Sequence, residues 1–267
     1  MRAILFGFVL FAVPVLTVAS NVDHGVEYGS GTALVIVRSA KSVLAAVDSK
    51  ETYRKFQEGV WSAEEKQICK AAPVGPYYSL VAGLDRGSDG FDALREISKA
   101  WQPGDSLVEL AARVTSSLPV RLSSLLETLR AADPAEFDQR YRNTVALQIA
   151  LLGVEGHNSK VIILEFLTNQ SSGNPALSVR TTECPGNCGR SPSAFFLGVH
   201  EKIDQSVQSD SRLVAGLRES NIASLVELER QNRPDLVGGP VAVIRMDSNG
   251  SALLQSGACS ATTGGLR

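Results

Sequence analysis

The stretch GTALVIVRSAKSVLAAVDSK, residues 31–50, decides the fold. Two runs of apolar and β-branched residues, Thr32–Arg38 and Val43–Val47, are separated by Ser-Ala-Lys-Ser, a pattern that predicts two strands joined by a turn. Asp48 follows the second run, so the hairpin brings its side chain back towards Thr32. A glycine stands directly before that threonine. The pair is either ordinary strand sequence or the start of an active site.

Upstream of this hairpin, the N-terminus has the layout of a secretory signal peptide. It has an arginine at position 2, an apolar run over residues 3–18, and small residues at Ala19 and Ser20. We expect residues 1–20 to be removed and the mature protein to be secreted or periplasmic. A retained membrane anchor is the alternative, but the apolar run is short and contains Pro14. Residues 21–31 are then a short propeptide or a flexible N-terminus, and residues 32–267 form a single domain.

The composition narrows the classes of partner. The chain has 267 residues, 44% of them hydrophobic and 20% charged, and a formal net charge of -2. These values are typical of a globular domain. The near-neutral balance argues against a nucleic-acid-binding protein, which usually carries a basic patch and a high pI. We expect no membrane partner once the signal peptide is gone.

Over the rest of the chain, several predicted strands in a row alternate with several predicted helices in a row. Residues 53–65 are polar and predict a loop or an extension. The pattern then predicts strands at 66–70 and 77–82, helices at 89–100, 106–128 and 133–143, strands at 145–153, 160–167, 176–182 and 194–198, helices at 211–219 and 221–231, and a strand at 240–247. Blocks of strands and helices indicate an α+β protein with largely antiparallel sheets.

Four cysteines, an even number in an exported chain, favour disulfides. Cys184 and Cys188 are separated by Pro-Gly-Asn, a tight loop that can bring the two thiols together. A zinc or redox role is the alternative, but the three histidines form no ligand-spaced cluster with them. Whether Cys69 and Cys259 also pair is not decided by the sequence.

A free N-terminal threonine can carry out nucleophilic catalysis by itself, because its hydroxyl attacks while its own α-amine accepts the proton. Cleavage of the Gly31–Thr32 bond would produce such a residue. Asp48 and Lys66, at the start of the next predicted strand, can tune the amine. Gly83 ends a predicted strand where a substrate carbonyl can approach the backbone, so its N–H is a candidate oxyanion donor. Taken singly, these are a strand threonine, a turn aspartate, a solvated lysine and a turn glycine.

The same run resembles the start of a proteasome β-type subunit, a threonine protease among the N-terminal nucleophile (Ntn) hydrolases. Thr32, Ala45-Ala46 and Asp48 stand at the matching places without a gap, and Lys66-Gln67-Ile68 resembles the family's catalytic lysine and the strand after it. The segment from Tyr77 to Gly83 resembles the strand that supplies the oxyanion hole. The segment from Val237 to Ile244 resembles a late Gly-Gly strand.

Two departures from the family pattern concern auxiliary serines. Where the family has Gly-Ser-Gly, this chain has Leu197-Gly198-Val199-His200, and the region before the late Gly-Gly reads Pro234-Asp235-Leu236-Val237. The expected serines are absent at both places. His200 is either a substitute polar contact or an ordinary residue at the start of a helix.

The resemblance implies a four-layer αββα sandwich of two antiparallel sheets with outer helices. It also implies a hydrolase that cleaves amide bonds in a peptide or protein substrate with Thr32, Asp48, Lys66 and Gly83 as catalytic residues, and that requires no metal or organic cofactor. The alternative is a catalytically inactive, proteasome-like binding or assembly protein. An amidase acting on small molecules and assembly into a homo-oligomer also stay open.

Overall fold

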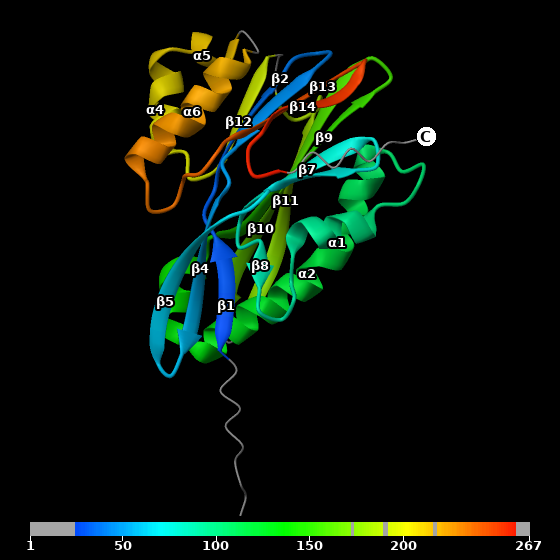
Figure 1. Ribbon diagram of the computed structural model, residues 1–267. Coiled ribbons are helices and arrows are strands. Elements are labelled where there is room, and N and C mark those ends of the chain that lie inside the picture. Colours follow the sequence, from blue (N-terminus) through cyan, green and yellow to red (C-terminus); the bar gives the residue numbers. More distant parts are fainter. Residues whose placement is uncertain (1–24, 172–173, 189–191, 216–217, 260–267) are drawn as a thin grey trace, which may run out of the picture.

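The computed structural model describes residues 25–171, 174–188, 192–215 and 218–259 (Figure 1). The predicted signal peptide, residues 1–20, lies outside these ranges, and so do residues 21–24 of the predicted propeptide. The described residues form three antiparallel sheets and six helices. We name the sheets after one strand each, as the β2, β9 and β1 sheets.

The β2 sheet contains the hairpin predicted from residues 31–50. Its strands, in spatial order, are β12 (Ser193–Gly198), β2 (Ala33–Arg38), β3 (Val43–Val47), β13 (Ala242–Asp247) and β14 (Gly250–Ser256). Both faces of β2 are covered, because Leu34 and Ile36 belong to one apolar core and Val35 and Val37 to another. Burial on both faces explains why this strand is a continuous apolar run rather than an alternating one.

The β9 sheet faces the β2 sheet across the first of these cores. Its strands, in spatial order, are β11 (Asn174–Cys184), β10 (Asn158–Ser171), β9 (Val145–Glu155), β7 (Tyr77–Gly83) and β6 (Ala71–Val74). Its other face packs against apolar side chains of α1 (Ala93–Ala100), α2 (Leu107–Ala132) and α3 (Pro134–Tyr141). The outer face of the β2 sheet packs against α4 (Glu201–Ser209), α5 (Arg212–Ala215) and α6 (Glu219–Asn232).

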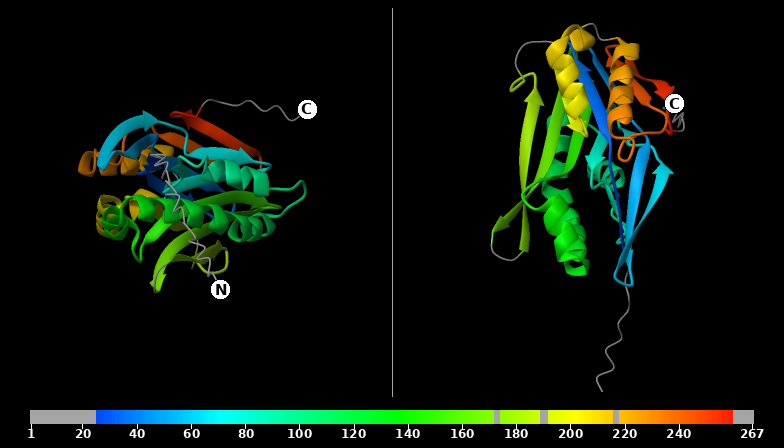
Figure 2. Two further views of the ribbon diagram at one scale, coloured as in Figure 1. Left: turned by 90° about the horizontal axis from the view of Figure 1, so that it is seen from below. Right: turned by 90° about the vertical axis from the view of Figure 1, so that its left-hand side faces the viewer.

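The β1 sheet is the third sheet and has no counterpart in the prediction. Its strands, in spatial order, are β5 (Val60–Gln67), β4 (Lys50–Gln57), β1 (Val26–Ser30) and β8 (Arg86–Gly87). In Figures 1 and 2, β1 and the β4–β5 hairpin extend away from the end of the molecule that carries α4 and α6.

The predicted four-layer αββα sandwich of two antiparallel sheets is therefore wrong. The structure is more β-rich than that architecture, with 43% strand and 31% helix, and its described residues form three antiparallel sheets. The physical reason lies in residues 53–65, which we predicted as a loop or an extension. They instead form most of β4 and β5, two paired strands that turn at Glu58 and Gly59, both with positive φ. Their polar side chains suit a hairpin that is largely solvent-exposed.

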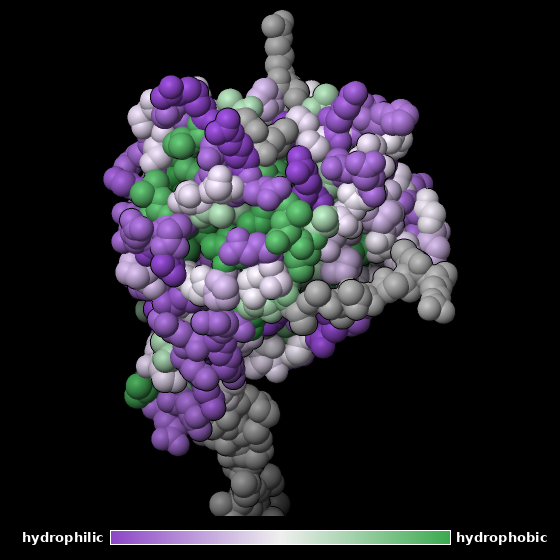
Figure 3. Space-filling view, turned by 45° about the horizontal axis from the view of Figure 1, so that its top comes forward, coloured by the Kyte–Doolittle hydropathy of each residue, from purple (hydrophilic) through white to green (hydrophobic). Residues whose placement is uncertain are grey.

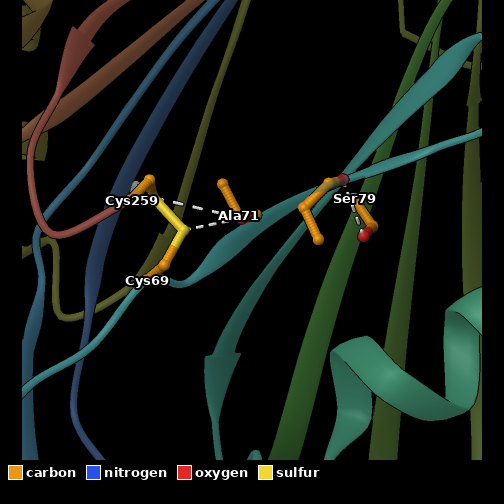
Figure 4. Close-up of a disulfide and its surroundings, with 5 residues drawn as sticks. Cys69, Ala71, Ser79 and Cys259 are labelled. Atoms are coloured by element: carbon orange, nitrogen blue, oxygen red, sulfur yellow. Dashed lines mark hydrogen bonds between the residues drawn. A yellow bond between two sulfur atoms is a disulfide. The ribbon is translucent and has the colours of Figure 1, made fainter. Parts of the chain in front are cut away.

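Two disulfides close the fold. The predicted bridge between Cys184 and Cys188 is confirmed, and Cys69 pairs with Cys259 across 190 residues of sequence. Figure 4 shows the second bridge beside the first residue of β6, Ala71, whose carbonyl oxygen lies 2.7 Å from Cys69 Sγ. This is a contact rather than a hydrogen bond, because a disulfide sulfur carries no hydrogen. Disulfides of this kind indicate an oxidising compartment.

The surface of the molecule carries both polar and apolar residues. The face seen in Figure 3 is largely polar, with smaller apolar areas between the polar ones. In the described part of the chain, no helix is both long and apolar enough to cross a membrane.

Candidate active site

The hairpin places Thr32 and Asp48 next to each other. Thr32 lies between β1 and β2, and Asp48 directly follows β3, which pairs with β2 so that Leu34 faces Val47. The ladder continues one residue further, because the Asp48 N–H donates to the Ala33 carbonyl oxygen at 3.3 Å. In return, the Ala33 N–H donates to Asp48 Oδ1 at 3.0 Å. The aspartate thus binds the residue that directly follows Thr32.

Asp48 is fixed from a second direction by the chain near the C-terminus. The Gly238 N–H donates to Asp48 Oδ2 at 2.9 Å, and the Lys50 N–H donates to the same oxygen at 3.3 Å. The Gly238 carbonyl oxygen in turn accepts from the backbone N–H groups of Ser49 and Lys50. Three backbone donors hold the carboxylate in one orientation, which is the arrangement that a buried carboxylate needs.

The lysine of the site is Lys70. It lies between β5 and β6, and its Nζ donates to Thr32 Oγ1 at 2.5 Å. The same Nζ also contacts the carbonyl oxygens of Gly31 and Lys50. Thr32, Asp48 and Lys70 are each 1% exposed, so the three polar side chains share a buried site. Thr32 Oγ1 also contacts the carbonyl oxygen of Gly31.

The structure does not bring Lys66, the lysine predicted for the site, to Thr32. The Lys66 side chain is 40% exposed, lies 3.2 Å from Glu64 and 3.9 Å from Glu27, and stacks over the ring of Tyr53. The reason is the register of the β4–β5 hairpin, in which Lys66 pairs with Glu51 inside a strand that we had not expected to begin before it. The strand ends at Gln67, and Lys70 is the next lysine along the chain.

The electrostatics of the site are dominated by burial. Burial raises the pKa of the Asp48 carboxyl, and this effect is opposed by the charge of Lys70 and by the backbone donors Gly238, Ala33 and Lys50. Charge on Asp48 is therefore retained only through these partners. Asp48 thus depends on the charge of Lys70, because a carboxylate left without such partners would be costly to bury.

A cavity of 630 Å³ opens onto the Gly31–Thr32 bond. It is lined by both residues of that bond, by Gly83 at the end of β7, and by polar side chains that include Arg140 and Gln148. Gly83 has a φ of 98°, and a Cβ on it would lie 2.5 Å from the Ala146 carbonyl oxygen, so only glycine fits there. The structure thus brings Gly83 to the same cavity as Thr32, and its oxyanion role stays a prediction.

The corner at Gly198–His200, where the proteasome pattern has an auxiliary serine, contacts Thr32 through its backbone. The Val199 N–H donates to the Thr32 carbonyl oxygen at 2.7 Å. The preceding Gly198 N–H donates to Gln148 Oε1 at 2.7 Å, which fixes the corner from β9. His200 lies directly before α4, with its Nδ1 2.8 Å from Asp204 Oδ2.

Comparison with known proteins adds no relative. No protein-family model matches the sequence, and a search of curated proteins finds no significant match. The resemblance to proteasome β-type subunits therefore rests on the sequence motifs quoted above alone.

The roles of two residues of the candidate site, Lys70 and Gly238, were not predicted from the sequence. Lys70 was missed because the polar hairpin before it was predicted as a loop or an extension. The available signal was its position between Cys69 and the apolar pair Ala71-Ala72, because a lysine flanked by such residues needs a buried partner. Gly238 was recognised only as part of a Gly-Gly resemblance. Its hydrogen bond to Asp48 follows from tertiary packing, which no local pattern encodes.

Proposed function

We propose that this chain is a threonine-type N-terminal nucleophile hydrolase that cleaves its own Gly31–Thr32 bond and then amide bonds in peptides. One observation carries the proposal. Lys70 Nζ contacts both the hydroxyl that would attack and the carbonyl oxygen that would become negative. An ammonium group at that oxygen stabilises the charge that develops there in an acyl transfer.

Self-cleavage needs one water molecule and no other reactant. Thr32 Oγ1 attacks the Gly31 carbonyl carbon, the bond from that carbon to the Thr32 nitrogen breaks, and the hydroxyl proton ends on the nitrogen. The product is an ester between Gly31 and Thr32. Water then hydrolyses the ester, which releases a carboxyl group on Gly31 and restores the Thr32 hydroxyl.

Turnover uses the amine that self-cleavage exposes. The free α-amine has a reference pKa of about 7.7 to 8.0, so near neutrality it can accept the hydroxyl proton and pass it to the leaving amine. In this scheme Asp48 keeps the Lys70 ammonium compensated, and Lys70 holds the hydroxyl. The Gly83 backbone is the candidate oxyanion donor. We further propose that the protein is exported, as its disulfides are typical of oxidising compartments.

A catalytically inactive binding or assembly protein is the second candidate, because β1 supports it. Residues Val26–Ser30 are a paired strand rather than a flexible N-terminus, with β4 on one side and β8 on the other. The uncleaved chain is therefore already a complete fold. In such a protein Thr32 would keep its amide bond and have no amine to act as a base.

The test is the N-terminus of the purified protein, measured by intact mass under denaturing conditions so that a retained fragment does not hide the cut. We expect a chain that begins at Thr32, and we expect Thr32→Ala and Lys70→Met to stay uncleaved. Lys66→Met is the matched control, because it removes a nearby lysine that does not reach the bond, and it should be cleaved like the unaltered chain. An unaltered chain that retains the Gly31–Thr32 bond after prolonged incubation favours the inactive protein.

A further inference from the structure

Strand β1 lies in a groove between two strand edges. It pairs antiparallel with β4 from Val26 to Ser30, and with β8 at Tyr28 and Gly29. Figure 1 shows β1 leading towards β2. Directly after β1, the Gly31 carbonyl oxygen and the Thr32 hydroxyl both contact Lys70 Nζ. If β1 left, β4 and β8 would each present an unpaired edge, which is the setting in which an extended peptide adds as a strand.

The chemistry of self-cleavage identifies this groove as a substrate site. The ester formed on Thr32 Oγ1 during self-cleavage has the segment up to Gly31 as its acyl part. The acyl-enzyme formed in turnover is the same kind of ester, with the N-terminal part of the substrate as its acyl part. Because the same Thr32 Oγ1 carries the acyl group in both reactions, both acyl chains extend from the same atom of one rigid site. Strand β1 therefore occupies the place that the N-terminal part of a substrate takes during turnover. This step depends on the proposed function.

The most specific contacts of β1 belong to Tyr28, the fourth residue before the cleaved bond. Its side chain is 0% exposed and meets Trp61 and Tyr141 edge to face, with ring centroids 5.7 and 6.0 Å away. Its hydroxyl donates to Glu136 Oε1 at 3.3 Å. Burial raises the pKa of Tyr28 to about 12, so the phenol keeps the proton that it donates.

Glu136 is held in place independently of the tyrosine. It accepts from Arg54 Nη1 at 2.9 Å and contacts Arg140 Nε. Trp61 is likewise fixed, because its Nε1 donates to Asp133 Oδ2 at 2.8 Å. The pocket thus combines two aromatic rings in edge-to-face contact with a fixed acceptor at its end, an arrangement that suits a phenol better than a plain ring.

From this arrangement we infer that the substrate is an extended peptide with tyrosine at the fourth position before the cleaved bond, bound by Trp61, Tyr141 and Glu136. The third position should be glycine. A Cβ on Gly29 would lie 1.8 Å from Glu51 Oε1, so any side chain there would have to displace the buried Glu51 carboxylate.

The experiment uses cleaved protein and three fluorogenic peptides. Each peptide is the acetylated sequence Val-Glu-Xaa-Gly-Ser-Gly joined by an amide bond to an aminocoumarin, with Xaa as Tyr, Phe or Ala. We expect kcat/KM to be at least about tenfold lower for Ala than for Tyr, because the aromatic contacts are lost. For Phe we expect a loss of about threefold to tenfold, because the hydrogen bond to a charged acceptor is lost. A β1 fragment that stays bound competes with all three peptides equally and leaves these ratios unchanged.

A variant pair assigns the effect to the pocket. Glu136→Gln should lower the Tyr-to-Phe ratio, because a neutral amide oxygen is a weaker acceptor than a carboxylate, whereas Asp138→Asn should leave the ratio as it is. Asp138 lies on the same helix but pairs with Arg142 at the surface. Turnover with equal kcat/KM for the three peptides overturns the inference and leaves the proposed function standing. A chain that never exposes Thr32 and turns over none of the peptides overturns both.

Discussion

Removing the disulfide between Cys69 and Cys259 should destabilise the protein far more than removing the one between Cys184 and Cys188. The two bridges close loops of very different length, with sequence separations of 190 and 4. In the chain-entropy model, a loop of the first size corresponds to about 5 kcal/mol and one of the second to about 2 kcal/mol. A domain is usually stable by only about 5 to 15 kcal/mol, so the first loss is a large share of the total.

The matched variants are Cys69→Ala with Cys259→Ala, and Cys184→Ala with Cys188→Ala. Alanine avoids placing a hydroxyl at Cys184 or Cys259, both of which are buried. The assay is urea unfolding followed by fluorescence, with the free energy of unfolding extrapolated to water. The first pair should lose about 3 kcal/mol more than the second. An equal or smaller loss in the first pair would refute the loop-length reasoning and show that local packing or residual structure in the unfolded chain decides the effect.

The remaining predictions concern the buried acids beneath β1. Burial, reinforced by the charge of Glu51, raises the pKa of Asp85 to about 8. Because the folded pKa lies above the unfolded value, the stability linked to Asp85 is complete below about pH 4 and is lost as the pH rises towards 8. The free energy of unfolding of Asp85→Asn, measured from pH 4 to 8, should therefore fall less than that of the unaltered chain. Gly29→Ala should lower the free energy of unfolding by about 1 to 3 kcal/mol through overpacking against the Glu51 carboxylate. A double variant that also carries Glu51→Ala should be more stable than Gly29→Ala alone, and an additive double loss would contradict the proposed clash.

The part of the site that could be predicted from sequence is the part that a single hairpin determines. Once β2 and β3 are recognised as paired strands, the pairing brings Asp48 back to Ala33, and the aspartate must lie beside Thr32. Local turn chemistry similarly predicted the bridge between Cys184 and Cys188. Each inference needed only residues that are close in sequence.

The part that failed needed contacts between distant segments. The lysine was misplaced by four residues because the length of the β4–β5 hairpin decides which lysine reaches the site, and its polar strands gave no apolar alternation to count. Strand β1 was missed although Val26 and Tyr28 alternate with polar or small residues, a pattern of a half-buried strand. Its partners, β4 and β8, were not predicted as strands, so nothing in the sequence reading indicated a third sheet.

The choice between an enzyme and an inactive relative depends on Lys70 more than on β1. Strand β1 is only weak support for the inactive protein, because an uncleaved enzyme precursor needs the same groove filled. Lys70 is 1% exposed, and a buried lysine is costly to keep charged. If its role were only structural, any set of hydrogen-bond acceptors around its Nζ would be sufficient. Among the described residues, Lys70 Nζ contacts three oxygen atoms, and two of them are Thr32 Oγ1 and the Gly31 carbonyl oxygen, the two atoms that an acyl transfer at this bond would involve. The Gly31–Thr32 bond, directly after β1, is contacted by Lys70 on both of its residues and also lines the 630 Å³ cavity. Cleavage of this bond is therefore the decisive measurement.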